Sequence, residues 1–302
     1  MKKTVAFLVF TFVISYSLAI IYGIIFKGSG SSAGFTILGV IYMFIPFISA
    51  IIVKLINREP LFKDLSISFR INRWFFVAWL IFPVMTAAII GVSVLMPWLS
   101  FSPEMAGLTE RYAETLTPEA LEQLKNQLNS LPENFVLLSI IQGLIAGITI
   151  NAVAAFGEEA GWRGFLLNEF KDMRFFKTSL IIGFIWGIWH APLILMGHNY
   201  PQHPEFGVVM MIIWCILLSP IFIYIRIKSK SVIAAAIAHG TLNAVAGLSI
   251  MVISGGNDLT SGVTGIPGFI TLLIFNAGFF VFDRFITKEK IMSGKISIHA
   301  NN

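Results

Sequence analysis

Long apolar runs alternate with short polar segments along most of the chain. An apolar helix needs roughly 20 residues to cross the hydrocarbon core of a bilayer, which is about 30 Å thick. Runs of about that length, each bounded by charged or turn-forming residues, predict eight spans. They cover residues 4–26, 34–56, 74–99, 137–160, 178–196, 208–226, 231–253 and 266–282. Further apolar residues follow the fourth run, so its helix is expected to continue to about Phe170.

Lys and Arg are concentrated in alternate segments between these runs, as is typical of cytoplasmic loops. With the amino terminus inside, only three of the 21 basic residues fall outside, namely Lys27, Arg111 and Lys125. This alternation predicts an even number of spans and two cytoplasmic termini. The sequence therefore predicts an all-α, polytopic membrane bundle of about eight transmembrane helices, in which residues 1–302 form a single integral membrane domain.

One hydrophilic segment, residues 101–134, is long enough to form structure of its own outside the bilayer. Thr117-Pro118-Glu119 is typical of a helix start, with a capping hydroxyl, a proline at the first helical position and an acid in the first turn. Leu121, Leu124 and Leu128 would share one face of that helix. The segment is expected to form an extracytoplasmic amphipathic helix. This helix either is an ordinary solvated loop helix, lies on the membrane surface or covers the extracytoplasmic mouth of the bundle.

The composition agrees with a lipid environment. Hydrophobic residues make up 56% of the chain and charged residues 12%, whereas soluble domains have about 45–50% and about 25%. The net charge of +5 is spread over short loops instead of one soluble face, which argues against a nucleic-acid partner. Cys215 is the single cysteine, so no intramolecular disulfide forms and thiolate metal chemistry is not expected. The first apolar run is longer than the roughly 7–15 residues of a secretory signal, so it is expected to be a retained span.

Strongly polar side chains at membrane depth are costly and usually carry function. The predicted spans contain few of them: Glu158, Glu159, Arg163, His190, His239 and Asn243, with Asn151 and Asn276 as milder cases. Counted from the predicted cytoplasmic ends at about 1.5 Å per residue, the two histidines lie about 12–18 Å deep. Glu158 reaches a similar level if its helix continues. Three spans therefore present polar groups at one level of the bilayer.

Helical spacing predicts which of these groups share a face. Glu159 and Arg163 are four residues apart and are expected to pair, whereas Glu158 is turned by about 100° and needs a different partner. His239 and Asn243 have the same spacing and should project together. A carboxylate and an imidazole can activate a water, while a second imidazole and an amide donate hydrogen bonds to the resulting oxyanion, so this group suits hydrolysis. The H-E-x-x-H motif and the P-loop are absent.

Residues around these polar groups are expected to serve packing. Several glycines would let the helices approach closely. They are Gly157, Gly161, Gly164, Gly183, Gly187, Gly240 and Gly247. Trp162, Trp186 and Trp189 are interpreted as packing residues or interface anchors, and the Glu159–Arg163 pair as structural support.

The polar residues fall into three motifs that resemble those of the CAAX protease and bacteriocin-processing family (CPBP, also called Abi), which includes the Ras-converting endopeptidase of eukaryotes. The E-E-x-x-x-R motif occurs as residues 158–163, F-x-x-x-H as residues 186–190 and H-x-x-x-N as residues 239–243. The second motif departs from the family in having Trp186 where phenylalanine is usual. The resemblance covers about 90 residues, and the order of the three motifs, each on a predicted membrane helix, argues against coincidence.

The resemblance implies an intramembrane endopeptidase with its catalytic core at about 137–253. By similarity, Glu158 and His190 would activate the water, and His239 and Asn243 would stabilise the oxyanion. Glu159 and Arg163 would support the site through their pair. The family has also been described as metalloproteases, in which case zinc would be held by Glu158, His190 and His239. We favour chemistry without a metal or other cofactor, because an asparagine aligned with His239 suits oxyanion donation better than zinc ligation.

The implied partners are the lipid bilayer and a membrane-associated peptide or protein substrate, cut in the cytoplasmic half of the membrane. The Lys2-Lys3 start, the compact length and the lack of sorting signals favour a bacterial cell membrane, where prenylated substrates are not expected. A non-catalytic alternative remains open from the sequence. In it, the same polar cavity would serve an immunity or scaffold protein or a small transporter.

Overall fold

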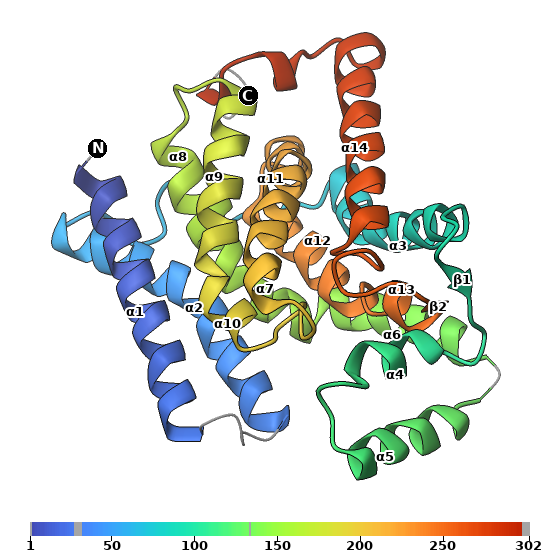
Figure 1. Ribbon diagram of the computed structural model, residues 1–302. Helices are drawn as coiled ribbons and strands as arrows, with labels where there is room; N and C mark the ends of the chain where they lie inside the picture. Colours follow the sequence, from blue (N-terminus) through green and yellow to red (C-terminus); the bar gives the residue numbers. More distant parts are fainter. Residues whose placement is uncertain (1, 27–31, 133, 298–302) are drawn as a thin grey trace.

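A computed structural model describes residues 2–26, 32–132 and 134–297, which form a bundle of helices with one two-stranded sheet (Figure 1). The long helices are α1 (Lys2–Phe26), α2 (Ser32–Ile56), α3 (Arg73–Val94), α11 (Pro204–Ser229), α12 (Val232–Val245) and α14 (Ile266–Val281). Shorter helices are α4 (Ala106–Tyr112), α5 (Pro118–Asn129), α6 (Phe135–Ile148), α7 (Ile150–Glu159), α8 (Leu167–Glu169), α9 (Phe175–Trp189), α10 (Ala191–Leu195) and α13 (Leu248–Met251). The π-helices η1 (Ala160–Leu166) and η2 (Phe282–Ile286), the 3-10 helix η3 (Ile291–Ser293) and the antiparallel strands β1 (Ser100–Phe101) and β2 (Ile253–Ser254) complete the fold.

The predicted all-α membrane bundle is confirmed, with a difference in how two spans are built. Within the described residues, six helices are long and apolar enough to cross a membrane, and a seventh span is the bent pair formed by residues 135–148 and 150–169. The predicted span 178–196 is divided, because the apolar helix α9 has 15 residues and ends before His190, where α10 begins a new turn. Within the described residues, six or seven spans are therefore found where eight were predicted, and α9 is too short to count as another.

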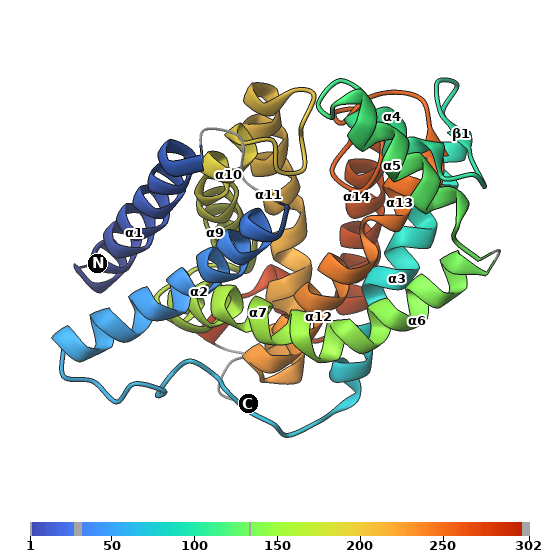
Figure 2. The same cartoon turned by 90° about the horizontal axis from the view of Figure 1, so that it is seen from below.

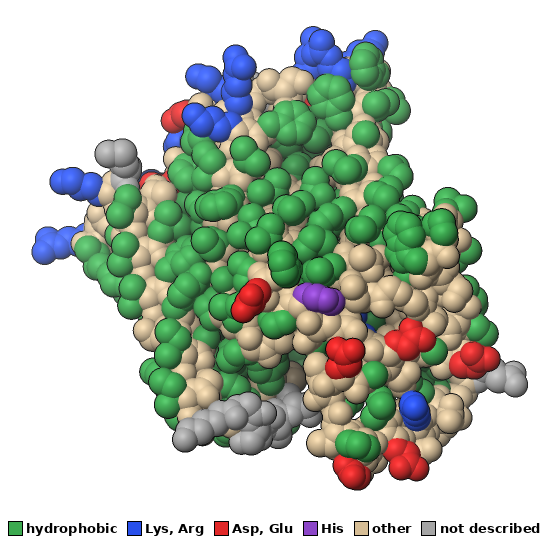
Figure 3. All heavy atoms as spheres, viewed as in Figure 1, with side chains coloured by type: hydrophobic (Ala, Val, Ile, Leu, Met, Phe, Trp, Pro, Cys, Tyr) green, Lys and Arg blue, Asp and Glu red, His purple; other side chains and the backbone are tan. Residues whose placement is uncertain are grey.

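The basic segments predicted to lie on one side of the membrane meet at one end of the bundle. They are joined by contacts between Lys3 and Glu59, Asn72 and Ser229, Ser231 and Ser68, Arg174 and Lys295, and Lys228 and Glu289. Figure 3 shows Lys and Arg side chains at the upper end, hydrophobic side chains across the middle and Asp and Glu around α4 and α5. This separation agrees with the predicted gathering of the basic segments at one end. Of the basic residues predicted at the other end, Lys27 lies outside the described residues.

The acidic segment 101–134 contains the predicted helix. α5 starts at Pro118, and the Thr117 hydroxyl accepts a hydrogen bond from the amide of Ala120 at 3.3 Å, so the predicted cap is confirmed. Leu128 on the predicted apolar face is buried in a small cluster with Leu99 and Val252. The pairing of β1 with β2 joins this segment to the chain after α13. The segment is thus packed onto one end of the bundle (Figure 1).

α12 lies at the centre of the fold and packs against α3, α6 and α7, and α7 lies between α12 and α2 (Figure 2). Two glycines make these approaches possible. A Cβ at Gly240 would lie 2.5 Å from the Ala152 amide nitrogen and 2.7 Å from the Gly147 oxygen, and one at Gly157 would lie 2.6 Å from the backbone of α2. Any larger residue would push the helices apart. The same expectation for Gly247 was wrong, because open space surrounds it.

Candidate active site

The helix that carries the E-E-x-x-x-R motif is bent before the motif begins. The sequence predicts an uninterrupted span over 137–160, but the axis turns by 50° between α6 and α7. At the bend, Thr149 has φ −118° and ψ −107°, and its hydroxyl donates to the Ile145 carbonyl at 2.7 Å. Asn151 donates to the Gly240 carbonyl at 3.3 Å, which fixes α7 against α12. The bend therefore directs the end of α7 into the centre of the bundle.

The motif continues into the π-helix η1, all seven residues of which are buried. The predicted continuation of this helix is confirmed, since α8 carries it to Glu169. A π-turn is rare and occurs mostly at functional sites, because its widened backbone leaves carbonyls without regular helical partners. Here Arg226 Nε donates to the Arg163 carbonyl at 3.2 Å. A side chain from α11 thus satisfies part of the widened turn.

The F-x-x-x-H motif lies at the broken end of α9. Pro192 has no amide hydrogen, so it leaves the Ile188 carbonyl without its usual helical donor. The Tyr16 hydroxyl donates to that carbonyl instead, at 2.7 Å. The Tyr42 hydroxyl donates to the neighbouring Trp189 carbonyl, also at 2.7 Å. Side chains from α1 and α2 therefore stabilise the broken helix end.

The same break orients His190. Its amide donates to the Gly187 carbonyl at 3.2 Å, and its ring atom Nδ1 lies 2.7 Å from the Trp186 carbonyl. A carbonyl oxygen only accepts hydrogen bonds, so Nδ1 carries the proton and Nε2 is left for other partners. The ring is half-buried and packs edge-on against Trp189, with 4.8 Å between ring centroids.

Glu159 joins two of the three motifs. Its Oε1 accepts hydrogen bonds from Arg163 Nη1 and from His239 Nδ1, both at 2.9 Å. The first contact is the predicted i, i+4 pair, whereas sequence reasoning missed the second. Glu159 and Arg163 have no exposed surface and His239 is 4% exposed. The guanidinium of Arg163 also stacks on the ring of Trp186, at 4.2 Å from its centroid.

Glu158 points to a different partner, as its helical rotation predicts. Its Oε2 accepts a hydrogen bond of 2.6 Å from the indole nitrogen of Trp186, and the residue is 2% exposed. The Trp186 ring centroid lies 5.7 Å from that of His190 and 5.6 Å from that of His239. Trp186 was interpreted as a packing residue from the sequence. The signal that could have found its role is its departure from the motif's phenylalanine, because only tryptophan has a donor.

Asn243 lies one helical turn beyond His239 on α12, and its side chain is exposed. The four residues predicted to be catalytic therefore differ in their access to solvent. Glu158 and His239 are buried, His190 is half-buried and Asn243 is exposed. This gradient leads from a buried carboxylate to an open amide, which is compatible with a substrate that approaches from the side of Asn243.

The alternative of a zinc site depends on whether three ligands converge. Across residues 2–26, 32–132 and 134–297, no group of three or more His, Cys, Asp or Glu side chains is arranged to hold a metal ion. Glu158, His190 and His239 thus do not form a ligand set in this geometry. We derive no chemical step through a metal.

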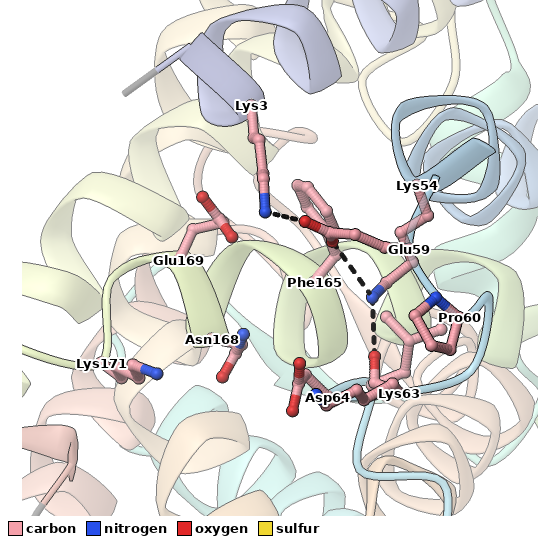
Figure 4. Close-up of a pocket in the computed structure, with 11 residues that line it drawn as sticks. Lys3, Lys54, Glu59, Pro60, Lys63, Asp64, Phe165, Asn168, Glu169 and Lys171 are labelled. Atoms are coloured by element: carbon pink, nitrogen blue, oxygen red, sulfur yellow. Dashed lines mark hydrogen bonds and ion pairs between the residues drawn. The ribbon is translucent and has the colours of Figure 1, made fainter. Parts of the chain in front are cut away.

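A separate, charged pocket of about 280 Å³ lies at the basic end of the bundle (Figure 4). Its walls come from the start of α1, the end of α2 with the loop after it, and α8. Lys54 donates to the Lys63 carbonyl at 2.7 Å, and Lys3 pairs with Glu59. The hydrogen bond from Lys3 lowers the pKa of Glu59. Because Phe165 of η1 lines the pocket, one continuous helical segment connects it to the polar cluster.

Comparisons with known proteins identify the same stretch of chain. Residues 134–245 match the family described as type II CAAX prenyl endopeptidase, Rce1-like. One curated relative, CAAX prenyl protease 2 of Methanococcus maripaludis, is 31% identical over 101 residues, which is 30% of this chain. The match spans 36% of the length of that relative. All three motifs, from Glu158 to Asn243, fall inside the matched residues. Residues 134–245 are therefore similar to the Rce1-like family of CAAX prenyl endopeptidases.

Proposed function

We propose that the chain is an intramembrane endopeptidase that hydrolyses a peptide bond of a membrane-associated substrate. The observation that carries this proposal is the convergence of polar groups from three helices in one buried cluster. Glu158 meets Trp186 of α9, and Glu159 meets His239 of α12. Burying such polar groups inside a membrane bundle is costly, so their presence usually indicates a function.

In the proposed reaction, a water bound between Glu158 and His190 is the nucleophile. The unbonded Nε2 of His190 and the Glu158 carboxylate hold the water and take one of its protons. Its oxygen then attacks the carbonyl carbon of the substrate, and the carbonyl oxygen becomes an oxyanion. The proton taken from water passes to the amide nitrogen, so that the C–N bond breaks and a free amine and a carboxylic acid are released.

His239 and Asn243 are the proposed donors to the oxyanion. Nδ1 of His239 is engaged with Glu159, so donation to the oxyanion must come from Nε2. The ring then carries both protons and a positive charge, which the Glu159 carboxylate compensates. Arg163 holds Glu159 in place from the other side. Glu159 and Arg163 are therefore proposed as positioning residues and not as groups that touch the substrate.

The substrate is proposed to be a membrane-associated peptide or protein, cut in the half of the bilayer nearest the basic end of the bundle. That end is proposed to be cytoplasmic, in agreement with the positive-inside rule. The name of the curated relative raises a prenylated CAAX-type peptide as one candidate substrate. A bacterial membrane regulator or peptide precursor without a prenyl group is the other. The two differ in a single chemical group, so one assay can compare them.

The test uses the full chain in liposomes with quenched fluorescent peptides of identical sequence, with and without a farnesyl group. Proteomics of membrane fractions from cells that express the wild type or Glu158→Gln extends the search to unmodified precursors. Glu158→Gln, His190→Ala and His239→Ala should each reduce cleavage at least 100-fold, as expected for loss of a general base or oxyanion donor. The matched control is Glu169→Gln, which removes a carboxylate from the same helical segment outside the cluster.

Retention of cleavage by Glu158→Gln would remove the proposed base and refute the mechanism. A scaffold, immunity protein or transporter that uses the same cavity should tolerate Glu158→Gln, because this change keeps the size and polarity of the side chain. A cellular phenotype that survives the substitution would therefore favour the non-catalytic alternative.

A further inference from the structure

Trp186 contacts polar side chains from all three motifs. Its indole nitrogen donates to Glu158 at 2.6 Å, and its ring lies 4.2 Å from the guanidinium carbon of Arg163. The rings of His190 and His239 pack edge-on against it from two sides. Trp186 itself is 1% exposed, so these contacts fix its orientation. This side chain is therefore surrounded by the groups to which the reaction is assigned.

The indole N–H is the one hydrogen-bond donor that meets Glu158 among the described residues. A buried carboxylate without a donor is costly, because it loses its hydrogen bonds to water and gains nothing in return. The bond occupies Oε2, so the carboxylate cannot rotate freely and Oε1 is left for a water. A phenylalanine, the usual residue of the F-x-x-x-H pattern, would keep the ring but supply no donor.

The backbone of Trp186 orients the other residue of the proposed pair. Its carbonyl accepts from Nδ1 of His190 at 2.7 Å, which leaves Nε2 of that ring unprotonated and available. The same residue therefore holds Glu158 through its side chain and His190 through its carbonyl. We infer that Trp186 is a positioning residue, whose indole N–H sets the carboxylate of Glu158 relative to His190 for water activation. This inference rests on the proposed function.

If Trp186 had only a structural role, its replacement by phenylalanine should have the same effect as replacement of another buried tryptophan of the bundle. Trp214 offers the comparison, because it is also buried and its ring packs beside that of Trp186 at 6.3 Å. Its indole nitrogen donates to the Val263 carbonyl at 3.0 Å, away from the polar cluster. Trp214→Phe therefore removes a donor of the same kind without touching Glu158.

The first measurement detects the contact without any need for activity. In protein labelled with ¹⁵N-tryptophan, the indole signal of Trp186 is the one that disappears in Trp186→Phe. Glu158→Gln should shift this signal, because a neutral acceptor forms a weaker hydrogen bond than a carboxylate. The signal of Trp214 should stay in place. A Trp186 signal that does not respond to Glu158→Gln would overturn the inference, whatever the activity.

The second measurement separates positioning from binding. Trp186→Phe should lower kcat about 10- to 100-fold, the range expected for loss of one hydrogen bond to a charged group, and leave KM within about twofold. Trp214→Phe should change neither constant, and both variants should unfold at nearly the same temperature. An unchanged kcat in Trp186→Phe would overturn the inference even if the signal shifts. If the wild type cleaves no substrate but the signal shifts, the proposed function fails and the hydrogen bond does not.

Discussion

The buried contact between Glu159 and Arg163 makes a quantitative prediction. Neither side chain has exposed surface, and Arg163 Nη1 lies 2.9 Å from Glu159 Oε1. Removal of one member of such a pair leaves the other as an uncompensated buried charge, at a cost of about 3–5 kcal/mol. Glu159→Gln should therefore lower the free energy of unfolding by about that amount. Stacking of Arg163 on Trp186 does not offset the loss, because it is present before and after the change.

Adding a second substitution, Arg163→Met, separates the effect on stability from the effect on cleavage. In the double variant Glu159→Gln with Arg163→Met, neither position 159 nor position 163 carries a charge, and replacement of a whole buried pair by neutral groups is often neutral or stabilising. Most of the lost stability should return. Activity should not return, because His239 still lacks the carboxylate that binds its Nδ1. Stability and activity are thus expected to separate between the single and double variants.

The assay is unfolding of the purified protein in detergent micelles, followed by circular dichroism, with peptide cleavage measured on the same samples. Glu289→Gln serves as a control, because it breaks the ion pair with Lys228 near the surface and should cost much less. Strictly additive losses in the double variant would show that Glu159 and Arg163 are not coupled. Full activity in the double variant would show that Glu159 does not assist His239.

Three further predictions address packing, pH and metal dependence. Gly240→Ala should cost about 1–3 kcal/mol of stability, because its Cβ would meet Ala152, whereas Gly91→Ala, with open space around it, should not; thermal unfolding compares the two. The pKa of Glu59 is lowered by its hydrogen bond to Lys3, so this pair stabilises the fold at neutral pH. Glu59→Gln should lower the unfolding temperature slightly at pH 7, and the difference should fade as the pH falls below the ordinary glutamate pKa of about 4.3 and vanish below the lowered pKa. Elemental analysis should find no stoichiometric zinc and chelators should leave cleavage unchanged; bound zinc with activity lost on chelation would refute metal-free chemistry.

The sequence predicted most of the spans and the basic end of the bundle because both depend on local composition. An apolar run of membrane length has few alternatives to a helix, and charged loops stay on one side. The Glu159–Arg163 pair was predictable for the same reason, since helix geometry fixes an i, i+4 contact. Because adjacent residues on a helix point about 100° apart, the sequence also predicted that Glu158 has a different partner from Glu159. The identity of that partner was not predictable, because it depends on how α9 is rotated against α7.

Other features that sequence reasoning missed arise where helices depart from regular α geometry. The bend at Thr149 contains no proline that would have predicted it, and the π-turn from Ala160 to Leu166 has no recognised sequence signal. A single π-turn changes the direction of every side chain after it, so spacing alone could not place Arg163 relative to α9 and α12. The break at His190 could be traced to Pro192, but not the resulting bond from His190 to the Trp186 carbonyl.

These irregularities have a common consequence for the site. Each interrupts the regular hydrogen bonds of a helix, and each is tied to another helix by a hydrogen bond: Asn151 to Gly240, Arg226 to Arg163, and Tyr16 to Ile188. These hydrogen bonds hold the bend, the π-turn and the helix break in one conformation, so the side chains at the site are oriented before any substrate binds. A bundle of regular helices could bring the same residue types to the same depth. It would not leave Nε2 of both histidines and one oxygen of Glu158 available, and that availability is what the proposed chemistry requires.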